Sequence, residues 1–346
     1  MIHRESSVLD KLCWEDNLEI NSVKNIVWYD LSRHAIDHIL DDNNIKNTDK
    51  VLVPEFMCHT LIEVIRHYTH QIISYKLNDN LNVDCDDLIV KIRDGIKLVF
   101  IVDYFGVKNK IDECTVKLLQ ERNIIIVRDM AHSFLTLHQN KYEIDNYSDY
   151  VFSSIYKSLK LYSGAILVIN KNSSFSYKSR IGVLPIISGL VKNIMKKLFF
   201  YFGIDYIRLN NECSNELYFR KITRFNVVSI YKFFFKKIDL YQVICERNLV
   251  SFELYRLVEK SDSAMSLFDF NQISDNTLQA FPIIFNTIES RNLIKKSLRK
   301  KSLDAYTWPH PHCLFNSSNL GDRILLIPVD EKSIIPLKEE LMCLDM

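Results

Sequence analysis

Residues 150–164 read YVFSSIYKSLKLYSG, and this stretch decides how the rest of the chain is interpreted. A strand-like run, Tyr150 to Phe152, is followed by two serines, then Lys157, then Gly164, where a second strand-like run begins. Lysine is rarely found between apolar neighbours at a strand end unless it is paired. A lysine held there can lose part of its charge and become a nucleophilic amine, suited to bonding with an aldehyde. The stretch alone leaves open the alternative of a surface lysine in a turn.

Composition and charge are those of an ordinary globular protein. The chain has 346 residues, of which 47% are hydrophobic and 25% charged, enough for a large core and two folded regions. Lysine plus arginine (44) nearly balances aspartate plus glutamate (43), so no nucleic acid or acidic membrane partner is expected.

Cysteine and glycine usage excludes several classes of site. The eight cysteines are scattered and form no CxxC pair, which indicates reduced thiols in a cytoplasmic protein and no zinc site. The first twenty residues contain no apolar run, so a signal peptide is not expected. With seven glycines the chain has no GxGxxG or GxxxxGK motif, and therefore neither a dinucleotide fingerprint nor a P-loop.

Amphipathic helices and apolar strands alternate between residues 28 and 170. Helices are expected at 32–42, 58–68, 84–93 and 111–122, and strands at 51–56, 72–77, 98–105, 123–129, 150–154 and 165–170. Ser32 is expected to cap the first helix, and Cys114, Leu118 and Leu119 to face inward from the fourth. Continuous apolar strands between such helices predict a mostly parallel sheet covered on both faces.

Ligands of such sheets bind beyond the carboxyl ends of the strands. Asp129, Ser153, Ser154 and Lys157 all lie at or just beyond the ends of expected strands, so they can converge on one crevice.

The second half of the chain is less regular. Residues 181–210 are apolar and aromatic but interrupted by proline, glycine and lysine, which is unlike a transmembrane helix. A helical excursion over the active site or a subunit interface is expected there, with an interfacial membrane helix as the alternative. A long helix is expected at 225–260, followed by an α+β region. The predicted division is a large α/β domain of residues 1–230 and a small domain of residues 231–346.

The segment VRDMAHSF (127–134) places Asp129 and His132 after an apolar strand. Taken alone, the aspartate could cap a helix and the histidine could be an ordinary polar residue. An aspartate and a lysine about thirty residues apart, both at strand ends, suggest another pairing, in which the carboxylate keeps a pyridine nitrogen protonated and the lysine carries the cofactor. This is the arrangement expected for pyridoxal phosphate.

Five segments in order resemble motifs of the DegT/DnrJ/EryC1/StrS family of pyridoxal-phosphate sugar aminotransferases. They are LSRHAI (31–36), VLVPEFMCHT (51–60), VDYFG (102–106), VRDMAHSF (127–134) and SSIYKSLKLYSGAIL (153–167). They are similar to the family's SGR-x-AL, P-x-Y-x-C, H/Y-x-FG, D-x-AH-S and SS-x-RK-x-LP-x-x-DGG motifs; in the C-terminal part only YTWP (306–309) matches. The resemblance implies a three-layer α/β fold with a mostly parallel seven-stranded sheet and a smaller α+β C-terminal domain.

The resemblance also implies roles for the matched residues. Lys157 would bind the cofactor covalently and shuttle a proton, while Asp129 would pair with the pyridine nitrogen. His132 would lie near the phenolic oxygen of the cofactor. Lys160 is the competing lysine, but it falls where the closest subgroup has a proline, so Lys157 is preferred.

The remaining matched residues would hold the phosphate and cover the ring. The phosphate would be held by Ser153 or Ser154 together with the backbone amides of Ser32, Arg33 and His34 at a helix N-terminus, which suits a dianion. Cys58 lies where many relatives place an aromatic ring over the cofactor, and His59 or Phe56 could take that place instead.

The implied protein is a cytoplasmic, homodimeric aminotransferase that uses pyridoxal phosphate and no metal. It would move an amino group, expected to come from glutamate, onto a nucleotide-linked keto-sugar for surface glycan or antibiotic synthesis. Partner-subunit residues would come from 215–224, and no nucleic acid or membrane insertion is expected.

Departures from the family pattern leave alternatives open. Ser32 replaces a glycine of the phosphate loop, Tyr156 replaces an arginine, and Lys160, Tyr162 and Ser163 replace a proline-rich run. The alternatives are a pyridoxal-phosphate sugar dehydratase, a transaminase of a non-nucleotide acceptor, or a non-catalytic relative serving as a regulatory or assembly subunit. The known dehydratase branch carries histidine at the lysine position, so Lys157 favours transamination.

Overall fold

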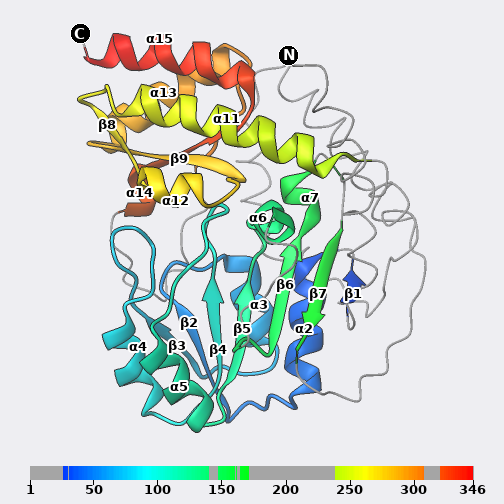
Figure 1. The fold of residues 1–346 in the computed structure, drawn as a ribbon. Coiled ribbons are helices and arrows are strands. Elements are labelled where there is room, and N and C mark those ends of the chain that lie inside the picture. The colour runs from blue at the N-terminus through cyan, green and yellow to red at the C-terminus, as the bar shows by residue number, and fades with distance from the viewer. Residues whose placement is uncertain are drawn as a thin grey trace.

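A seven-stranded sheet in the order β1-β7-β6-β5-β4-β2-β3 forms the centre of the large region (Figure 1). The computed structural model describes residues 26–29, 31–139, 147–159, 161, 164–170, 238–307 and 320–345. The strands are β1 (Ile26–Tyr29), β2 (Lys50–Pro54), β3 (Ile72–Tyr75), β4 (Ile96–Val102), β5 (Ile125–Asp129), β6 (Tyr150–Ser154) and β7 (Ala165–Ile169). Strands β2 to β6 pair in parallel, whereas β7 is antiparallel to both β6 and β1. The predicted mostly parallel sheet is therefore confirmed.

Helices cover both faces of this sheet because successive strand residues point to opposite sides. Val51 and Val53 of β2 pack with helices α2 (Ser32–Asp42) and α3 (His59–Arg66), whereas Leu52 packs on the other side with α4 (Cys85–Ile92) and α5 (Glu113–Glu121). On that second side, α6 (Phe134–Gln139) and the start of α11 (Leu240–Val258) cover β6 and β7. Each fully buried apolar side chain in these layers contributes about 1.5–3 kcal/mol.

Three expectations about these elements are wrong, and strands β2 and β3 also end two residues earlier than expected, at Pro54 and Tyr75. The N-cap of α2 is Leu31 and not Ser32, whose side chain forms a hydrogen bond with Ser154 at the end of β6. Cys114 of α5 is exposed, and the inward positions are Thr115 and Leu119. Strand β4 ends at Val102 and not at Phe105, because Phe105 adopts a φ of 55°, which leaves the extended region. The short strand β1 was not anticipated from the sequence.

The C-terminal region is built on a second, three-stranded antiparallel sheet in the order β10-β9-β8. Its strands are β8 (Ala264–Ser266), β9 (Ala280–Phe285) and β10 (Ile324–Pro328). Helices α11, α13 (Ile288–Lys300) and α15 (Ile334–Asp345) pack on it, and α12 (Phe270–Ser274) and α14 (Leu320–Arg323) lie between these elements in the chain. Figure 1 shows this region at the end of the large sheet towards which β4, β5 and β6 point.

Several predictions from the middle of the chain fall outside the described residues. These are the boundary at residues 230 and 231, the excursion at 181–210 and the partner residues at 215–224, so the division into two domains stays a prediction. Within the described ranges no helix is long and apolar enough to cross a membrane.

The C-terminal region docks on the turn after β4 through a close backbone approach. Gly106 has a φ of 112°, and a Cβ placed on it would lie 2.5 Å from the carbonyl oxygen of Thr277. Thr136 Oγ1 donates to the Gly106 carbonyl at 2.7 Å and accepts from the Thr277 amide at 3.0 Å. The Gln279 amide also donates to the Phe105 carbonyl at 2.8 Å. Only glycine combines this φ with this contact, which explains the glycine of the VDYFG motif.

We therefore expect Gly106→Ala to destabilise the fold by on the order of 3 kcal/mol, since it adds a backbone clash to backbone strain. Gly95→Ala is the matched control, because Gly95 also has positive φ (75°) but nothing lies within 4 Å of an added Cβ. The free energy of unfolding of Gly95→Ala should fall by only about 1 kcal/mol. Urea unfolding of both proteins measures the difference, and equal losses would contradict the docking contact.

Candidate active site

Lys157 lies on the four-residue helix α7 (Ile155–Ser158), directly after β6. The Gly164 carbonyl accepts hydrogen bonds from the amides of Ile155 at 2.9 Å and Tyr156 at 3.3 Å, which closes this turn back into β7. Gly164 has a φ of 130°, a conformation that favours glycine. The turn thus holds Lys157 at the carboxyl end of β6, where the sequence placed it.

The amine of Lys157 contacts the imidazole of His132. Lys157 Nζ lies 3.2 Å from His132 Nε2. The His132 ring stacks on Phe105 with centroids 5.8 Å apart and an interplanar angle of 10°. Burial, together with the charge of Lys157, lowers the pKa of His132 well below its usual value. His132 is therefore neutral near pH 7 and can accept a hydrogen bond from the Lys157 ammonium.

The ionisation of Lys157 differs from the sequence expectation. Burial lowers the pKa of this amine, but Tyr156, Cys58 and Asp129 raise it, and the net result is a pKa above the usual value. The expectation that its position alone would cost Lys157 part of its charge is therefore wrong for the protein without a cofactor. The acidic groups around the amine outweigh desolvation.

Asp129 ends β5 and is 4% exposed. Its Oδ1 accepts a hydrogen bond from the Ala131 amide at 2.8 Å, so the carboxylate closes a turn and does not cap α6, which begins at Phe134. Burial raises the pKa of Asp129 to about 6, although Lys157 acts in the opposite direction. A buried carboxylate of this kind is stabilised by a nearby cation, and a protonated ring nitrogen is one such partner.

The structure separates the serines that were predicted to bind phosphate. Ser154 Oγ forms a short hydrogen bond with Ser32 Oγ at the N-terminus of the 11-residue helix α2, and both side chains are buried. Ser153 Oγ instead donates to the Met130 carbonyl at 2.6 Å. Ser32 and Ser154 therefore form the hydroxyl pair at the helix N-terminus, and Ser153 is occupied elsewhere.

Of the three predicted backbone donors, His34 is already used, because its amide donates to the Leu31 carbonyl at 3.0 Å. The imidazole of His34 has a buried Nδ1 with no hydrogen-bond partner, and burial lowers its pKa to about 4. The amides of Ser32 and Arg33 stay predicted phosphate donors at this helix N-terminus.

The candidates for a ring cover occupy different environments. Cys58 is half-buried at the N-cap of α3 and close enough to Lys157 to influence its pKa. Phe56 is 4% exposed and packs on Tyr104, with ring centroids 5.7 Å apart, so it belongs to the core. The His59 side chain is about half exposed, and its Nε2 atom lies 3.4 Å from Glu63 Oε1. The role predicted for Cys58 stays a prediction, whereas the Phe56 side chain is packed in the core and is not placed to cover the cofactor ring.

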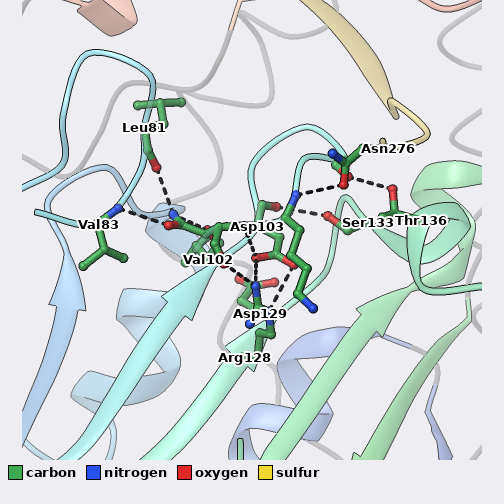
Figure 2. A network of polar contacts seen from close by, with 12 residues as sticks. Leu81, Val83, Val102, Asp103, Arg128, Asp129, Ser133, Thr136 and Asn276 are labelled. Atoms are coloured by element: carbon green, nitrogen blue, oxygen red, sulfur yellow. Dashed lines mark hydrogen bonds and ion pairs between the residues drawn. The ribbon is translucent and has the colours of Figure 1, made fainter. Parts of the chain in front are cut away.

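A buried ion pair lies directly behind Asp129 (Figure 2). Arg128 contacts Asp103 through Nη2 at 2.9 Å and through Nε at 3.2 Å, and neither side chain is more than 1% exposed. Arg128 also donates to the Asn109 carbonyl at 2.6 Å and to the Tyr147 hydroxyl at 2.9 Å. The Asp103 amide donates to the Asp129 carbonyl at 2.9 Å. These contacts fix the end of β5 and thereby the direction of Asp129.

Three residues of the C-terminal region approach the lysine turn without having been predicted. Gln279 Nε2 lies 3.4 Å from the Lys157 carbonyl and 3.2 Å from the Tyr306 hydroxyl. Arg247 Nη2 donates to the Ser158 carbonyl at 2.7 Å. Only Tyr306 carried a sequence signal, through the YTWP match; Trp308 and Pro309 lie outside the described residues, as does Lys160.

Among the described residues no group of three or more histidine, cysteine, aspartate or glutamate side chains is placed to hold a metal ion. The described cysteines, Cys58, Cys85, Cys114, Cys245 and Cys343, are free thiols.

Residues 32–168 match the model of the DegT/DnrJ/EryC1/StrS aminotransferase family. None of the curated proteins matches the chain. Among solved structures, the aminotransferase TlmJ from Streptoalloteichus hindustanus has 12% identity and a TM-score of 0.64, covering 97% of this chain and 91% of that chain. A DegT DnrJ EryC1 StrS aminotransferase from Brucella abortus has 14% identity and a TM-score of 0.64, covering 100% of this chain and 91% of that chain.

A third similar structure is Helicobacter pylori PseC, an aminotransferase involved in the biosynthesis of pseudoaminic acid. It has 14% identity and a TM-score of 0.63, covering 96% of this chain and 90% of that chain. At these identities the structures show the fold. The family resemblance and the α/β fold class predicted from the sequence are confirmed.

The raised pKa of Asp129 predicts how stability depends on pH. The folded protein binds this proton more tightly than the unfolded chain, so stability falls as pH rises from about 4 to about 6. The loss attributable to Asp129 should be about 3 kcal/mol. Denaturant unfolding of cofactor-free protein between pH 4.5 and 7 should show a fall that Asp129→Asn largely removes.

Asp94→Asn is the control, because Asp94 is exposed and should leave the pH profile unchanged. Parallel pH profiles for the wild type and Asp129→Asn would contradict the assignment of the burial penalty to Asp129.

Proposed function

We propose that the chain is a member of the DegT/DnrJ/EryC1/StrS aminotransferase family, whose model residues 32–168 match, and that it carries pyridoxal phosphate on Lys157 and aminates a keto-sugar. The predictions of an aminotransferase and of pyridoxal phosphate as its cofactor are confirmed at the level of the family. The sugar, its nucleotide carrier and glutamate as the amino donor are parts of the proposal.

One observation carries the proposal. Asp129, His132 and Lys157 meet beyond the ends of neighbouring strands β5 and β6, and Ser154 at the end of β6 forms a hydroxyl pair with Ser32 at the N-terminus of α2. This set fits the cofactor, because a buried carboxylate suits a protonated pyridine nitrogen and a helix N-terminus suits a phosphate dianion. Lys157 would hold the cofactor through its amine.

Lys157 and His132 have different roles in binding and proton transfer. When bound, pyridoxal phosphate supplies an electron sink that lets an amino group be taken from one substrate and given to another. Lys157 Nζ, when free, holds or donates a proton beside the reacting centre. His132 is neutral and 3.2 Å away, so it orients this amine and can accept a hydrogen bond from it.

Asp129 keeps its place because the turn at Ala131 and the ion pair behind it leave it little freedom. Its carboxylate would stabilise a positive charge on the ring nitrogen in a site that excludes water. The proposal of a sugar acceptor rests on the family and on neighbours such as PseC and the putative sugar aminotransferase Spr1654 from Streptococcus pneumoniae.

Two alternatives have distinct signatures. A pyridoxal-phosphate sugar dehydratase, or a transaminase of a non-nucleotide acceptor, would bind the cofactor but not aminate a nucleotide-linked keto-sugar. A non-catalytic assembly subunit would not bind the cofactor at all. A homodimer and a cytoplasmic location, as predicted from the sequence, complete the proposal.

The first test is an absorbance spectrum of the purified protein with added pyridoxal phosphate. We expect a visible band from cofactor attached to a lysine, retained by Lys117→Ala and lost in Lys157→Ala. Lys117 is the control because its side chain is 78% exposed and its nearest ion-pair partner, Glu121, lies 3.9 Å away on the surface. Borohydride reduction followed by peptide mapping should locate the cofactor on Lys157. A folded wild type with no band would overturn the proposal in favour of the non-catalytic alternative.

The serine geometry gives a second test. Ser154→Ala should weaken binding of pyridoxal phosphate by about tenfold, because a hydrogen bond to a charged group is worth about 1.5–3 kcal/mol. Binding of pyridoxal, which has no phosphate, should change little. Ser153→Ala should instead lower the free energy of unfolding, since it removes the buried hydrogen bond from Ser153 Oγ to the Met130 carbonyl and leaves only the Ser133 amide as donor there. Equal effects of the two serine variants on both ligands would refute the distinction.

A further inference from the structure

Gln279 occupies a junction between the C-terminal region and the lysine turn. Its side-chain Nε2 reaches the Lys157 carbonyl at 3.4 Å and the Tyr306 hydroxyl at 3.2 Å. Its main-chain amide donates to the Phe105 carbonyl at 2.8 Å. One residue therefore contacts both the backbone of Lys157 and the turn that carries Phe105.

Phe105 is also linked to the side-chain amine of Lys157. The Phe105 ring stacks on His132, and His132 Nε2 lies 3.2 Å from Lys157 Nζ. Gln279 therefore reaches Lys157 by two routes. Its side chain contacts the Lys157 carbonyl directly, and its main-chain amide is linked to the Lys157 amine through Phe105 and His132. Phe105 is fully buried with a φ of 55°, so its conformation depends on these surrounding contacts.

Arg247 anchors this junction from helix α11. Its Nη1 donates to the carbonyls of Leu278 at 3.1 Å and Gln279 at 2.9 Å, and its Nη2 donates to the Ser158 carbonyl at 2.7 Å. A planar guanidinium can bridge these three acceptors, which belong to two distant segments, in a fixed geometry. The ammonium of a lysine could not, because it lacks the rigid fork.

The lysine turn needs such support. Helix α7 has four residues and Ser154, its N-cap, makes no side-chain capping bond. The bonds of the Ile155 and Tyr156 amides to the Gly164 carbonyl fix the start of the turn, and the Lys157 carbonyl is contacted by Gln279 of the C-terminal region. Catalysis by a lysine depends on the position of its amine to within a fraction of an ångström.

We propose that Gln279, anchored by Arg247, is a positioning residue that sets the orientation of Lys157 from the C-terminal region. This inference rests on the proposed function, since it concerns the lysine assigned to the cofactor. Neither residue touches the amine itself, and both act through the backbone of the turn and through His132.

The test compares Gln279→Ala, Arg247→Met and Arg247→Lys with the wild type. Gln279→Ala removes the contacts with Lys157 and Tyr306 but keeps the main-chain bonds of Gln279, so it should fold even where an Arg247 variant does not. Gln242→Ala and Arg256→Gln on the same helix are the controls. Gln242 is exposed and pairs with Glu246, and Arg256 is 69% exposed and pairs with Glu253.

Two measurements report on Lys157 without activity. The first is the pH midpoint of the visible band after loading with pyridoxal phosphate, which should move by about half a unit or more in Gln279→Ala and both Arg247 variants. The second is the rate of reductive methylation of Lys157 in cofactor-free protein, followed by mass spectrometry, which should rise about threefold. With a suitable substrate pair, kcat should fall about tenfold while KM changes less than twofold.

The controls should match the wild type in every measurement, and Arg247→Lys should fail to restore wild-type values. A band midpoint, methylation rate and kcat unchanged in folded Gln279→Ala would overturn the proposal. Loss of thermal stability with these readouts unchanged would likewise show a structural role only. A wild type without a band would defeat the proposed function, whereas the methylation rate of the cofactor-free protein would still decide the positioning role.

Discussion

The buried ion pair between Arg128 and Asp103 is the constraint on which the site depends. Both charges are removed from water, and such a pair is tolerated only when each group finds further partners. Here Arg128 adds the Asn109 carbonyl and the Tyr147 hydroxyl, and Asp103 accepts the Asn109 amide at 2.9 Å. Arg128 and Asp129 are adjacent on β5 and point to opposite faces, so fixing the arginine on one face fixes the aspartate on the other. Figure 2 shows the pair beside the ends of β4 and β5.

Burial then determines the charge states at the strand ends. Asp129 and His132 are both pushed towards their neutral forms, because desolvation disfavours charge on either. Lys157 keeps its proton because acidic neighbours outweigh its desolvation. In the cofactor-free protein the site therefore has a protonated lysine facing a neutral histidine, with a carboxylate that is costly to ionise nearby. A cofactor that offers a cationic ring nitrogen and an anionic phosphate relieves the cost at Asp129 and uses the helix N-terminus at Ser32.

The C-terminal region belongs to the site as much as the large sheet does. Residues 276–279 run along the turn after β4, and their contacts with Phe105, Gly106 and Thr136 leave no room for a side chain at position 106. The same segment leads into β9 and is held by Arg247 from α11. Rigid contact between the two regions at this point means that a change in one can reach the lysine turn in the other. The site thus forms where the core of the large sheet meets the core of the C-terminal region, which itself includes Phe56, Tyr104 and Phe105 of the large region.

The sequence by itself determined most elements of the large sheet, although not β1, and many of the side chains at their ends. Apolar strands that alternate with amphipathic helices specify a parallel sheet, and a parallel sheet brings Asp129 and Lys157 to one edge because their strands end there. These inferences need only local patterns and one rule of topology. The tertiary structure decided what depends on side-chain direction and on neighbours distant in the chain. It paired Ser154 and not Ser153 with Ser32, raised the pKa of Lys157, buried Phe56 in the core, and brought Gln279 and Arg247 to the lysine turn. Desolvation, hydrogen-bond geometry and long-range packing are properties of the folded surroundings, and no local pattern encodes them.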